Sequence, residues 1–469
     1  MANENRTVAA DGGALEQFGY KQELKRQLGL WDVVLYGVLF MVIIAPHSIY
    51  GYVMQDGGGM PTLVYLVGFC AILFTALSYM AMSARFPIAG SVYSYVQRGI
   101  NPHIGFLSGW VILLDYCIAP ALLYTMVGNW GVALIDALFG FSAPWVSWVW
   151  IVAFIAFNTF VNIRGMSMSK GIDWVFFAIE ILIVIAVVVL AIGYISGGGG
   201  TGEFNMDPIW QPGKVTPGFI AAACSIACLN FLGFDGISTL AEETDHPEKN
   251  IGRGILIALV IIVICFMLQT YFAALAMPLD TPGFDPDIAF FQTGEAIGGK
   301  AFYIILLVVN IFAIGVANIM NAQLAASRLL YGMGRDKVIP SFFGKVHPKY
   351  QTPWLASFFI GGIALLLTFL GVERLTTLVN FGALTAFIVL NFAVFWYFFV
   401  KGGHRDAKGI VRYLICPWCG IFILGFIFTG FMPFTMIVGF SWLAIGVVVG
   451  AIKSKGYKEV PEAFKNLEF

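Results

Sequence analysis

The sequence predicts an all-α polytopic membrane protein with twelve transmembrane helices, and composition and hydropathy are the first grounds for this. Apolar residues make up 59% of the 469 residues and charged residues only 11%, whereas a soluble domain has roughly 25% charged residues. The mean hydropathy is +0.84. At roughly 20 residues per span, a chain of this length has room for about a dozen spans. The charged residues are too few to cover a water-facing surface, so a soluble domain is excluded.

Twelve apolar runs mark the expected spans, whose boundaries are accurate to within several residues. In chain order they cover residues 33–54, 61–82, 104–136, 145–163, 172–195, 217–240, 254–277, 300–326, 354–371, 375–400, 413–431 and 434–452. The third run is longer than a perpendicular span requires. We therefore expect it to tilt strongly or to extend past the bilayer.

Lys and Arg divide unevenly between the loops when the N-terminus is placed on the cytoplasmic side. Of the 26 Lys and Arg residues, 23 then fall in cytoplasmic segments, and only Lys214, Lys300 and Arg374 fall on the opposite side. Cytoplasmic loops of membrane proteins have such an excess of positive charge. We therefore expect both termini in the cytoplasm. Because moving one span would scramble this division, it also supports the number of spans.

Spans one and six are each interrupted near their middle. Span one contains Ala45-Pro46-His47-Ser48 with Gly51 soon after, and span six contains Asn230-Phe231-Leu232-Gly233-Phe234-Asp235-Gly236. Proline removes a helical hydrogen bond, and unpaired backbone at membrane depth is tolerated only where protein or a water-filled cavity supplies partners. Interrupted helices at matching positions of two halves indicate a transporter binding site, although ordinary kinks are the alternative. The expected substrate-binding residues at these breaks are Pro46, His47, Ser48, Gly51, Asn230, Phe231, Gly233 and Phe234.

Three carboxylates lie within the predicted spans: Asp115 in span three, Glu180 in span five and Asp235 at the break in span six. Charged groups in the bilayer interior are costly, so they are rare and are functional-site candidates. No Lys or Arg lies at comparable depth. Each carboxylate either binds a substrate ammonium or transfers a coupling proton, and the alternative is a structural hydrogen bond to a neighbouring helix.

Three long motifs, reaching from the second span to the ninth, resemble the amino acid–polyamine–organocation (APC) superfamily of permeases. The first, after span two, is Arg85-Phe-Pro87-Ile-Ala-Gly90-Ser-Val-Tyr93-Ser-Tyr95. The second, around span six, is Phe231-Leu-Gly233-Phe-Asp235 with Glu242-Glu243 and Pro247-Glu-Lys-Asn250-Ile-Gly-Arg253. The third, after span eight, is Ser327-Arg328-Leu-Leu-Tyr331-Gly-Met-Gly-Arg335-Asp336, which continues through Pro340 to Val346-His347-Pro348 and Thr352-Pro353. Within the superfamily, Gly105-Phe-Leu-Ser-Gly109-Trp110 and Leu114-Asp115-Tyr116 look like the third span of the putrescine-importer branch. The resemblance implies a leucine-transporter-like fold of two inverted five-span repeats plus two C-terminal spans, working by alternating access.

The same resemblance implies roles for the three carboxylates. Relatives often have a lysine at the position of Glu180, where it occupies what is a sodium site in distant cousins, so a titratable group there implies coupling to protons. Asp235 matches an acidic family position near the cytoplasmic path and is the second expected proton site. Asp115 is the expected ligand of a substrate amine, because its counterpart belongs to the amine-importing branch.

The chain departs from the family pattern at the break in span one. Amino acid transporters usually have a Gly-Ser/Thr-Gly stretch there, whose amides hold the substrate carboxylate, and putrescine importers commonly have an aspartate near the position of Ser48. This chain has Pro46-His47-Ser48 instead. The missing glycines favour a substrate without an α-carboxylate, and the missing aspartate leaves putrescine itself open.

We therefore expect a secondary active transporter, coupled to H⁺, that imports a small organic amine or polyamine. The alternatives are a neutral amino acid permease or an amino acid/amine exchanger, and, from a different class, a membrane channel or sensor. The sequence has no Walker motif, metal-ligand cluster or nucleophile–base pair, so we expect no enzyme, no ATP-driven pump, no cofactor and no nucleic-acid partner.

The expected organisation has four parts. They are a cytoplasmic segment 1–30, a transport core 31–400 with repeats at about 31–196 and 216–400, two accessory spans within 401–453, and a cytoplasmic tail 454–469. We expect this protein in a plasma membrane, the cytoplasmic membrane of a bacterium.

Overall fold

The computed structural model describes residues 28–88, 91–164, 170–241, 243–335, 339–350 and 352–458. The predicted cytoplasmic segment 1–30 and tail 454–469 lie mostly outside these ranges. Within them all regular secondary structure is helical, apart from one isolated bridge between Leu28 and Thr244. The main helices are α2 (Leu30–Met41), α3 (Tyr50–Asp56), α4 (Pro61–Arg85), α5 (Ser91–Gly99), α6 (Pro102–Phe139), α7 (Pro144–Arg164), α8 (Lys170–Ser196), α9 (Pro217–Ala227), α10 (Pro247–Ala276), α11 (Ala289–Phe312), α12 (Ile319–Arg335), α13 (Trp354–Leu367), α14 (Val372–Val394), α15 (Ala407–Gly409), α16 (Cys416–Phe428) and α17 (Pro433–Lys453).

The helices match the twelve predicted spans. Eleven helical segments of the described chain are long and apolar enough to cross a membrane, and the shorter apolar helix Trp354–Leu370 lies where the ninth span is expected. Helix α6 has 38 residues, which at about 1.5 Å per residue is far longer than a bilayer core of about 30 Å. The third span therefore extends past the bilayer, as its long apolar run predicts.

Proline and capping side chains set where many of these helices begin. Prolines occupy the first turn of α4, α6, α9, α10 and α17, where the missing N–H has no helical partner to lose. The side chain of Asn101 caps α6 by accepting the Ile104 N–H at 2.9 Å. Thr216 caps α9 in the same way through the Phe219 N–H. Local sequence signals thus place the loop-to-helix boundaries.

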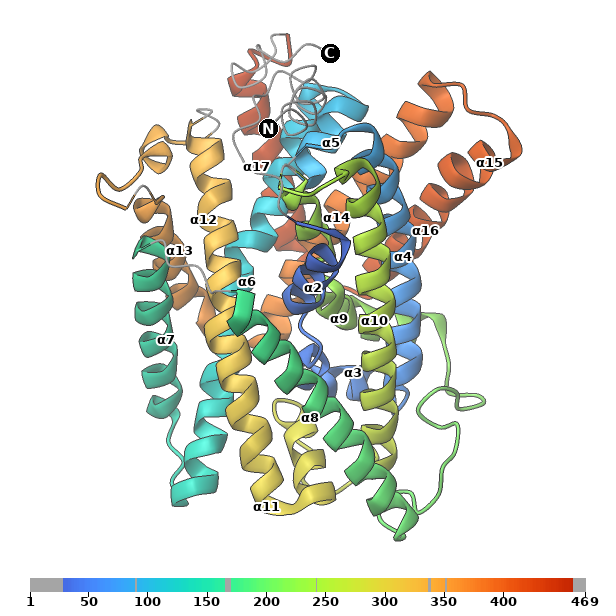
Figure 1. Cartoon of the computed structure of the whole chain (residues 1–469), viewed down its shortest axis with the longest axis vertical. Helices are drawn as coiled ribbons and strands as arrows, with labels where there is room; N and C mark the ends of the chain where they lie inside the picture. Colours follow the sequence, from blue (N-terminus) through green and yellow to red (C-terminus); the bar gives the residue numbers. More distant parts are fainter. Residues whose placement is uncertain are drawn as a thin grey trace, which may run out of the picture.

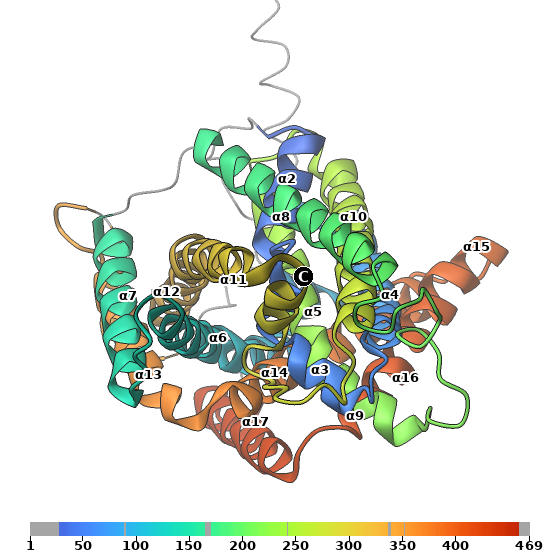
Figure 2. The same ribbon diagram turned by 90° about the horizontal axis from the view of Figure 1, so that it is seen from below.

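The helices run between two ends of the bundle, visible in Figure 1. We call the end at which α4 and α17 finish, at Arg85 and Lys453, the inner end. The opposite end, where α6 and α8 finish at Phe139 and Ser196, is the outer end. Span one therefore starts at the inner end, and span six, the first span of the second half, starts at the outer end, so the two halves have opposite orientations. Seen along the bundle axis, α6 and α14 lie towards the centre of the bundle, and α2 lies nearer its rim beside α8 and α10 (Figure 2).

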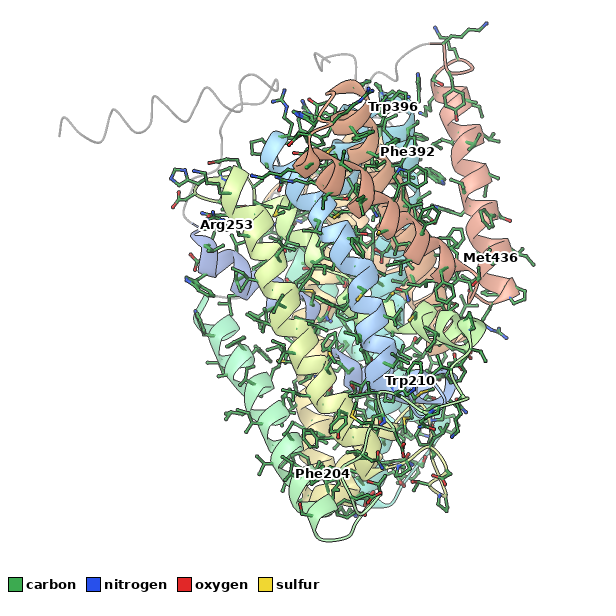
Figure 3. The ribbon with its side chains drawn as sticks, turned by 90° about the vertical axis from the view of Figure 1, so that its right-hand side faces the viewer. Phe204, Trp210, Arg253, Phe392, Trp396 and Met436 are labelled. Carbon is green, nitrogen blue, oxygen red and sulfur yellow. The ribbon has the colours of Figure 1, made fainter. Side chains whose placement is uncertain are left out.

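Large side chains lie near both ends of the bundle. Figure 3 shows Arg253 and Trp396 towards the inner end and Phe204 and Trp210 towards the outer end. Phe204 and Trp210 are about half exposed, at 51% and 53%. Large aromatic residues are enriched where a membrane protein meets the lipid–water interface.

Both predicted breaks are present. In span one, α2 ends at Met41, a short 3₁₀ turn (η1) covers Ala45–Ser48, and α3 resumes at Tyr50. Val42 has a φ of 60°, a conformation that is strained for a β-branched residue. In span six, α9 ends at Ala227, and two 3₁₀ segments follow, η2 (Cys228–Phe231) and η3 (Phe234–Leu240).

Glycine is required between η2 and η3. Gly233 has a φ of 110°, and a Cβ there would lie 2.5 Å from the ring of Phe40 in α2. A backbone position with a positive φ and so close a neighbouring ring accommodates only glycine. The break in span six therefore packs against the last turn of α2, directly before the break in span one.

Span eight has two further irregularities. Gly299 inside α11 has a φ of 71° and a ψ of −178°, so the first turns of α11 form a separate short helix at the outer end, and the span begins after it. Further along, a π-helical segment η4 (Ala313–Asn318) separates α11 from α12. π-helical turns are frequent at functional sites.

Two contacts tie distant parts of the chain together. At the inner end, the Leu28 N–H donates to the Glu243 carbonyl at 3.0 Å, and the Asp245 N–H donates to the Leu28 carbonyl at 2.9 Å. This pairing joins the start of span one to the segment after span six. In the C-terminal part, the indole N–H groups of Trp110 in α6 and Trp442 in α17 each donate to the other's backbone carbonyl at 2.9 Å, and their rings stack at 4.7 Å.

Candidate functional site

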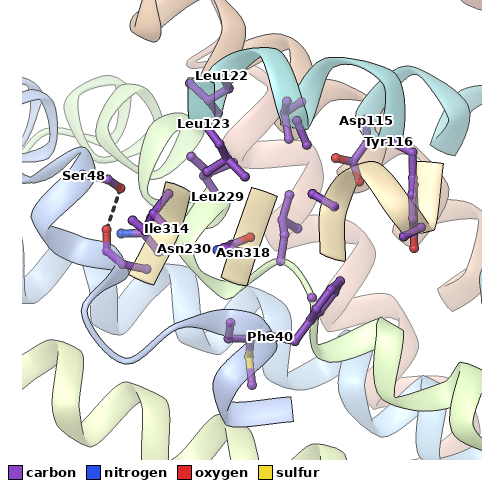
Figure 4. Close-up of a pocket in the computed structure, with 18 of the residues that line it drawn as sticks. Phe40, Ser48, Asp115, Tyr116, Leu122, Leu123, Leu229, Asn230, Ile314 and Asn318 are labelled. Atoms are coloured by element: carbon purple, nitrogen blue, oxygen red, sulfur yellow. Dashed lines mark hydrogen bonds between the residues drawn. The ribbon is translucent and has the colours of Figure 1, made fainter. Parts of the chain in front are cut away.

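A cavity lies between the two breaks, and it takes its walls from both halves of the fold (Figure 4). It has a volume of about 820 Å³, counting the part open to solvent. Its walls come from α2, η1, α6, η2, η3, η4, α12 and α14. The lining residues are Phe40, Met41, Ala45, Ser48, Asp115, Tyr116, Ala119, Leu122, Leu123, Met126, Leu229, Asn230, Leu232, Gly233, Asp235, Ile314, Asn318, Ala322, Ala325 and Val379. Most of these side chains are apolar.

Two carboxylates stand at the inner part of this cavity. Asp115 of α6 and Asp235 of η3 are within electrostatic range of each other, and Tyr116 is within range of both. Asp235 is 5% exposed. No Lys, Arg or His is among the lining residues, so the field of the two carboxylates favours a cationic ligand.

Asp115 occupies a point of close helix approach. A Cβ at Gly382 of α14 would lie 2.9 Å from the Asp115 backbone nitrogen. The glycine therefore lets α14 pack directly on the α6 turn that bears Asp115. This packing fixes the backbone from which the carboxylate reaches the cavity.

Neutral polar groups stand at the other part of the cavity, beside the breaks. Figure 4 shows Ser48 and Asn230 on the side away from Asp115 and Tyr116, with Asn318 next to Asn230. The Ser48 hydroxyl donates to the Ala45 carbonyl at 2.6 Å, and the Asn230 amide donates to the Tyr65 hydroxyl at 2.6 Å. Asn318 ends the π-helical segment η4, which turns its amide into the cavity.

Glu180 lies behind the break in span one instead of in the cavity. Its carboxylate Oε2 accepts the Ile43 N–H at 3.0 Å, across 137 residues of sequence, and the side chain is 3% exposed. Gln269 of α10 donates its Nε2–H to the Ile43 carbonyl at 2.9 Å. Side chains from α8 and α10 thus satisfy backbone that the break leaves without helical partners.

His47 lies on the outer side of the break, under aromatic rings. Its ring stacks on Phe290 at 3.8 Å and meets the edge of Phe291 at 6.5 Å. The Asn310 amide nitrogen lies 3.0 Å from His47 Nδ1. An amide nitrogen only donates, so Nδ1 is the acceptor and neutral His47 bears its hydrogen on Nε2.

A lid closes the site from the outer end. We define the outer lid as residues 285–298, which precede Gly299. The Tyr52 hydroxyl donates to Asp287 Oδ1 at 2.7 Å, and a Cβ at Gly51 would lie 2.7 Å from the Pro286 carbonyl carbon. Burial raises the pKa of Asp287, an effect opposed by the hydrogen bond from Tyr52.

The cavity extends from the breaks towards the inner end. Phe40 and Met41 precede the break in α2, and Ala322 and Ala325 follow η4 along α12. All four lie on the inner side of the breaks, whereas His47 and the lid close the outer side. The structure therefore has its outer path closed and its cavity directed inwards.

The structure brings together only part of the predicted binding set. Of the predicted binding residues, Ser48, Asp115, Asn230 and Gly233 line the cavity, and so does Asp235, which is predicted as a proton site. Five predicted binding residues do not line it and are packed against other parts of the chain: Pro46, His47, Gly51, Phe231 and Phe234. Phe231 packs on Tyr65 and Phe266, and Phe234 on Tyr79 and Phe387.

Sequence reasoning missed four polar residues of this region: Tyr116, Gln269, Asn310 and Asn318. Gln269 and Asn310 are fully buried, and each lies in an apolar span. An amide side chain in the middle of an apolar span itself indicates a polar site. A search restricted to ionisable groups does not find it. In the described residues no group of three or more His, Cys, Asp or Glu is arranged to hold a metal ion.

Comparison with known proteins gives concordant matches. The amino acid permease family matches residues 34–451. The low-affinity putrescine importer PlaP of Escherichia coli (strain K12) is 34% identical over 444 residues, covering 94% of this chain and 96% of that protein. The branched-chain amino acid permease BcaP of Bacillus subtilis (strain 168) is 25% identical over 469 residues, covering 94% and 95%.

Among solved structures, MhsT in complex with L-phenylalanine matches with a TM-score of 0.61 at 14% identity. The match covers 85% of this chain and 98% of that one. At this identity the likeness concerns the fold alone. It agrees with the helical architecture described above and confirms the fold class predicted from the sequence.

Proposed function

The chain belongs to the amino acid permease family, and we propose that it is a proton-coupled secondary transporter that imports small organic amines. The observation that supports this most directly is Asp115, a carboxylate on a membrane-spanning helix that lines a cavity with no Lys, Arg or His among its lining residues. A carboxylate inside a span is costly unless a positive charge or a proton accompanies it. A transported ammonium supplies that positive charge.

The break in span one offers little to a substrate carboxylate. Pro46 has no N–H, the Ile43 N–H is held by Glu180, and the N–H groups of Ala45 and His47 donate to backbone carbonyls. The carboxylate of Glu180 also lies next to this backbone and would repel an anion. These contacts support a substrate that lacks an α-carboxylate.

Glu180 is suited to couple protonation to the movement of span one. Its carboxylate accepts a hydrogen bond from the unwound backbone at Ile43, so its charge state acts directly on the break. Cys265 of α10 lies within electrostatic range of it. When Glu180 is ionised it holds the Ile43 N–H more strongly than when it is neutral, so protonation loosens the break and permits the change of state.

Alternating access then follows from the two ends of the site. In the state described here the outer lid is closed and the cavity extends inwards, which corresponds to the release step of an importer. We place the inner end in the cytoplasm from the distribution of Lys and Arg, and the protein in a bacterial cytoplasmic membrane. On this view Asp235 takes the second proton and Asp115 the ammonium.

Uptake into proteoliposomes tests this proposal. Labelled putrescine and labelled leucine are supplied to reconstituted protein with and without an inward proton gradient, and with sodium in place of the gradient. We expect saturable amine accumulation that requires the proton gradient. Uptake that depends on sodium and ignores pH would refute proton coupling, and uptake of leucine alone would refute the substrate class. Large ohmic currents would indicate a channel.

Glu180→Gln separates coupling from binding. Glutamine keeps an acceptor for the Ile43 N–H but cannot be charged. We expect amine exchange across the membrane to continue and the stimulation by a proton gradient to disappear. Stimulation that survives in this variant would assign the coupling proton elsewhere.

A further inference from the structure

The cavity has two chemically different ends, and their difference bears on the shape of the substrate. The inner end has the carboxylates of Asp115 and Asp235 around Tyr116. The end beside the breaks has one hydroxyl and two amides, those of Ser48, Asn230 and Asn318. No carboxylate is among the lining residues at that second end.

The inner end can hold one ammonium. Asp115 and Asp235 are within electrostatic range of each other, and Asp235 and Arg328 both lie within electrostatic range of Tyr36. Protein charge of both signs therefore surrounds Asp235, and Asp115 supplies the negative charge for the substrate. A second ammonium at this end would be repelled by the first.

The end beside the breaks suits an uncharged group. Asn230 already donates to Tyr65, which leaves its carbonyl oxygen as an acceptor, and Asn318 offers both a donor and an acceptor. A hydroxyl or amide of a ligand can exchange hydrogen bonds with these groups. An ammonium placed there would be desolvated without a carboxylate partner, which is strongly unfavourable.

Between the two ends the walls are aliphatic. Leu122 and Leu123 of α6, Leu229 of η2 and Ile314 of η4 lie between Asp115 and Ser48 (Figure 4). Such walls favour methylene groups of a ligand through removal of apolar surface from water. The cavity therefore combines one cationic end, a short apolar middle and one neutral polar end.

We propose that the preferred substrates are short primary amines with one ammonium and a neutral hydrogen-bonding group at the far end of an aliphatic chain, such as amino alcohols, in preference to α,ω-diamines. This inference rests on the proposed function as an amine transporter and specifies its substrate class. Asn318 is a specificity-determining residue in this arrangement. It contacts the neutral end of the substrate, and Asp115 binds the ammonium.

Three ligands of equal chain length test the proposal: 4-amino-1-butanol, n-butylamine and 1,4-diaminobutane. Their dissociation constants are measured by calorimetry on the purified full chain, at a pH where all the amines are charged. We expect the amino alcohol to bind about tenfold or more tightly than the diamine, because one unmatched charge or one lost buried hydrogen bond has an effect of this order. n-Butylamine is expected to lie between them.

Variants at the neutral end of the cavity test whether that end selects between the three amines. Asn318→Leu should bring the amino alcohol and n-butylamine to similar affinities, because it removes the hydrogen-bonding partner of the hydroxyl. Ser48→Asp places a carboxylate at the neutral end and should reverse the preference in favour of the diamine. Asn391→Leu is the control, since it makes the same replacement at a buried asparagine that bonds Thr75 away from the cavity. It should leave the ratios unchanged.

The outcomes separate the proposed substrate preference from amine transport itself. Tighter binding of 1,4-diaminobutane than of 4-amino-1-butanol, or an Asn318→Leu variant with unchanged ratios, overturns the proposed substrate preference and leaves amine transport standing. If none of the three amines binds or is taken up, the proposed function itself fails.

Discussion

Gly51→Ala is expected to prevent the outer lid from closing. The Cβ of alanine would overlap the backbone of Pro286, with the carbonyl carbon at 2.7 Å. Backbone cannot move aside as a flexible side chain can, so either α3 or the lid must shift. Gly51 lies inside helix α3 and does not have a positive φ, so alanine brings no strain of its own to the backbone.

The size of the effect follows from this overlap. Inserting a methyl group into a tightly packed contact costs about 1–3 kcal/mol. At about 1.4 kcal/mol for each factor of ten, this changes the ratio of lid-closed to lid-open protein by about 5- to 150-fold. The variant should therefore bind amine from the outer side and transport it slowly, because closure of the lid precedes release at the inner end.

Hydrogen exchange measured by mass spectrometry reports the lid directly. Peptides covering residues 49–56 and 286–298 should exchange faster in Gly51→Ala by the same factor, since exchange follows the population of the open form. Gly218→Ala is the matched control, because a Cβ there meets no atom within 4 Å. A folded Gly51→Ala protein with unchanged exchange in both peptides would refute the reasoning.

Three further substitutions have definite expectations. Asp115→Asn should weaken amine binding by about 10- to 150-fold, which is the effect of losing a charge-assisted hydrogen bond. Its control is Asp136→Asn, which changes an exposed aspartate on the same helix and should leave amine binding unchanged. Calorimetry measures the dissociation constants of both variants. Gln269→Met removes the donor to the Ile43 carbonyl and should change the pH dependence of uptake, whereas Gln323→Met, at another buried glutamine, should lower thermal stability with an unchanged pH profile. Gly446→Val would collide with the Trp110 ring, whose Cγ lies 2.8 Å from a Cβ there, and should lower the thermal midpoint without altering the preference between amines.

The sequence was sufficient for the spans and for the position of both breaks. Hydropathy depends on composition within each segment, and Pro46 and Gly233 impose local backbone geometry wherever they occur. The two breaks therefore stand where predicted, and the twelve apolar segments correspond to helices. The predicted start of the eighth span at residue 300 also agrees with the break at Gly299.

The composition of the cavity could be predicted only in part. Asp115 and Asp235 could be predicted because a carboxylate in a span is unusual whatever surrounds it. Which side of a break His47 faces, by contrast, depends on Phe290, 243 positions later in the chain. The contact of Glu180 with Ile43 spans 137 residues, and the π-helical turn that directs Asn318 has no simple sequence signature. These features arise from tertiary packing.

The pairing of Leu28 with Glu243 and Asp245 has a practical consequence for handling the molecule. These two hydrogen bonds connect the start of the first span with the segment after the sixth, so the two broken spans are held together there. A fluorescent protein or immobilisation tag fused close before Leu28 would strain these hydrogen bonds and disturb turnover. The same tag placed after α17 would pull on a helix that the tryptophan pair joins to α6. Because this pair lies away from both breaks, we expect turnover to remain intact. Fusions for imaging or surface capture therefore belong at the C-terminal end.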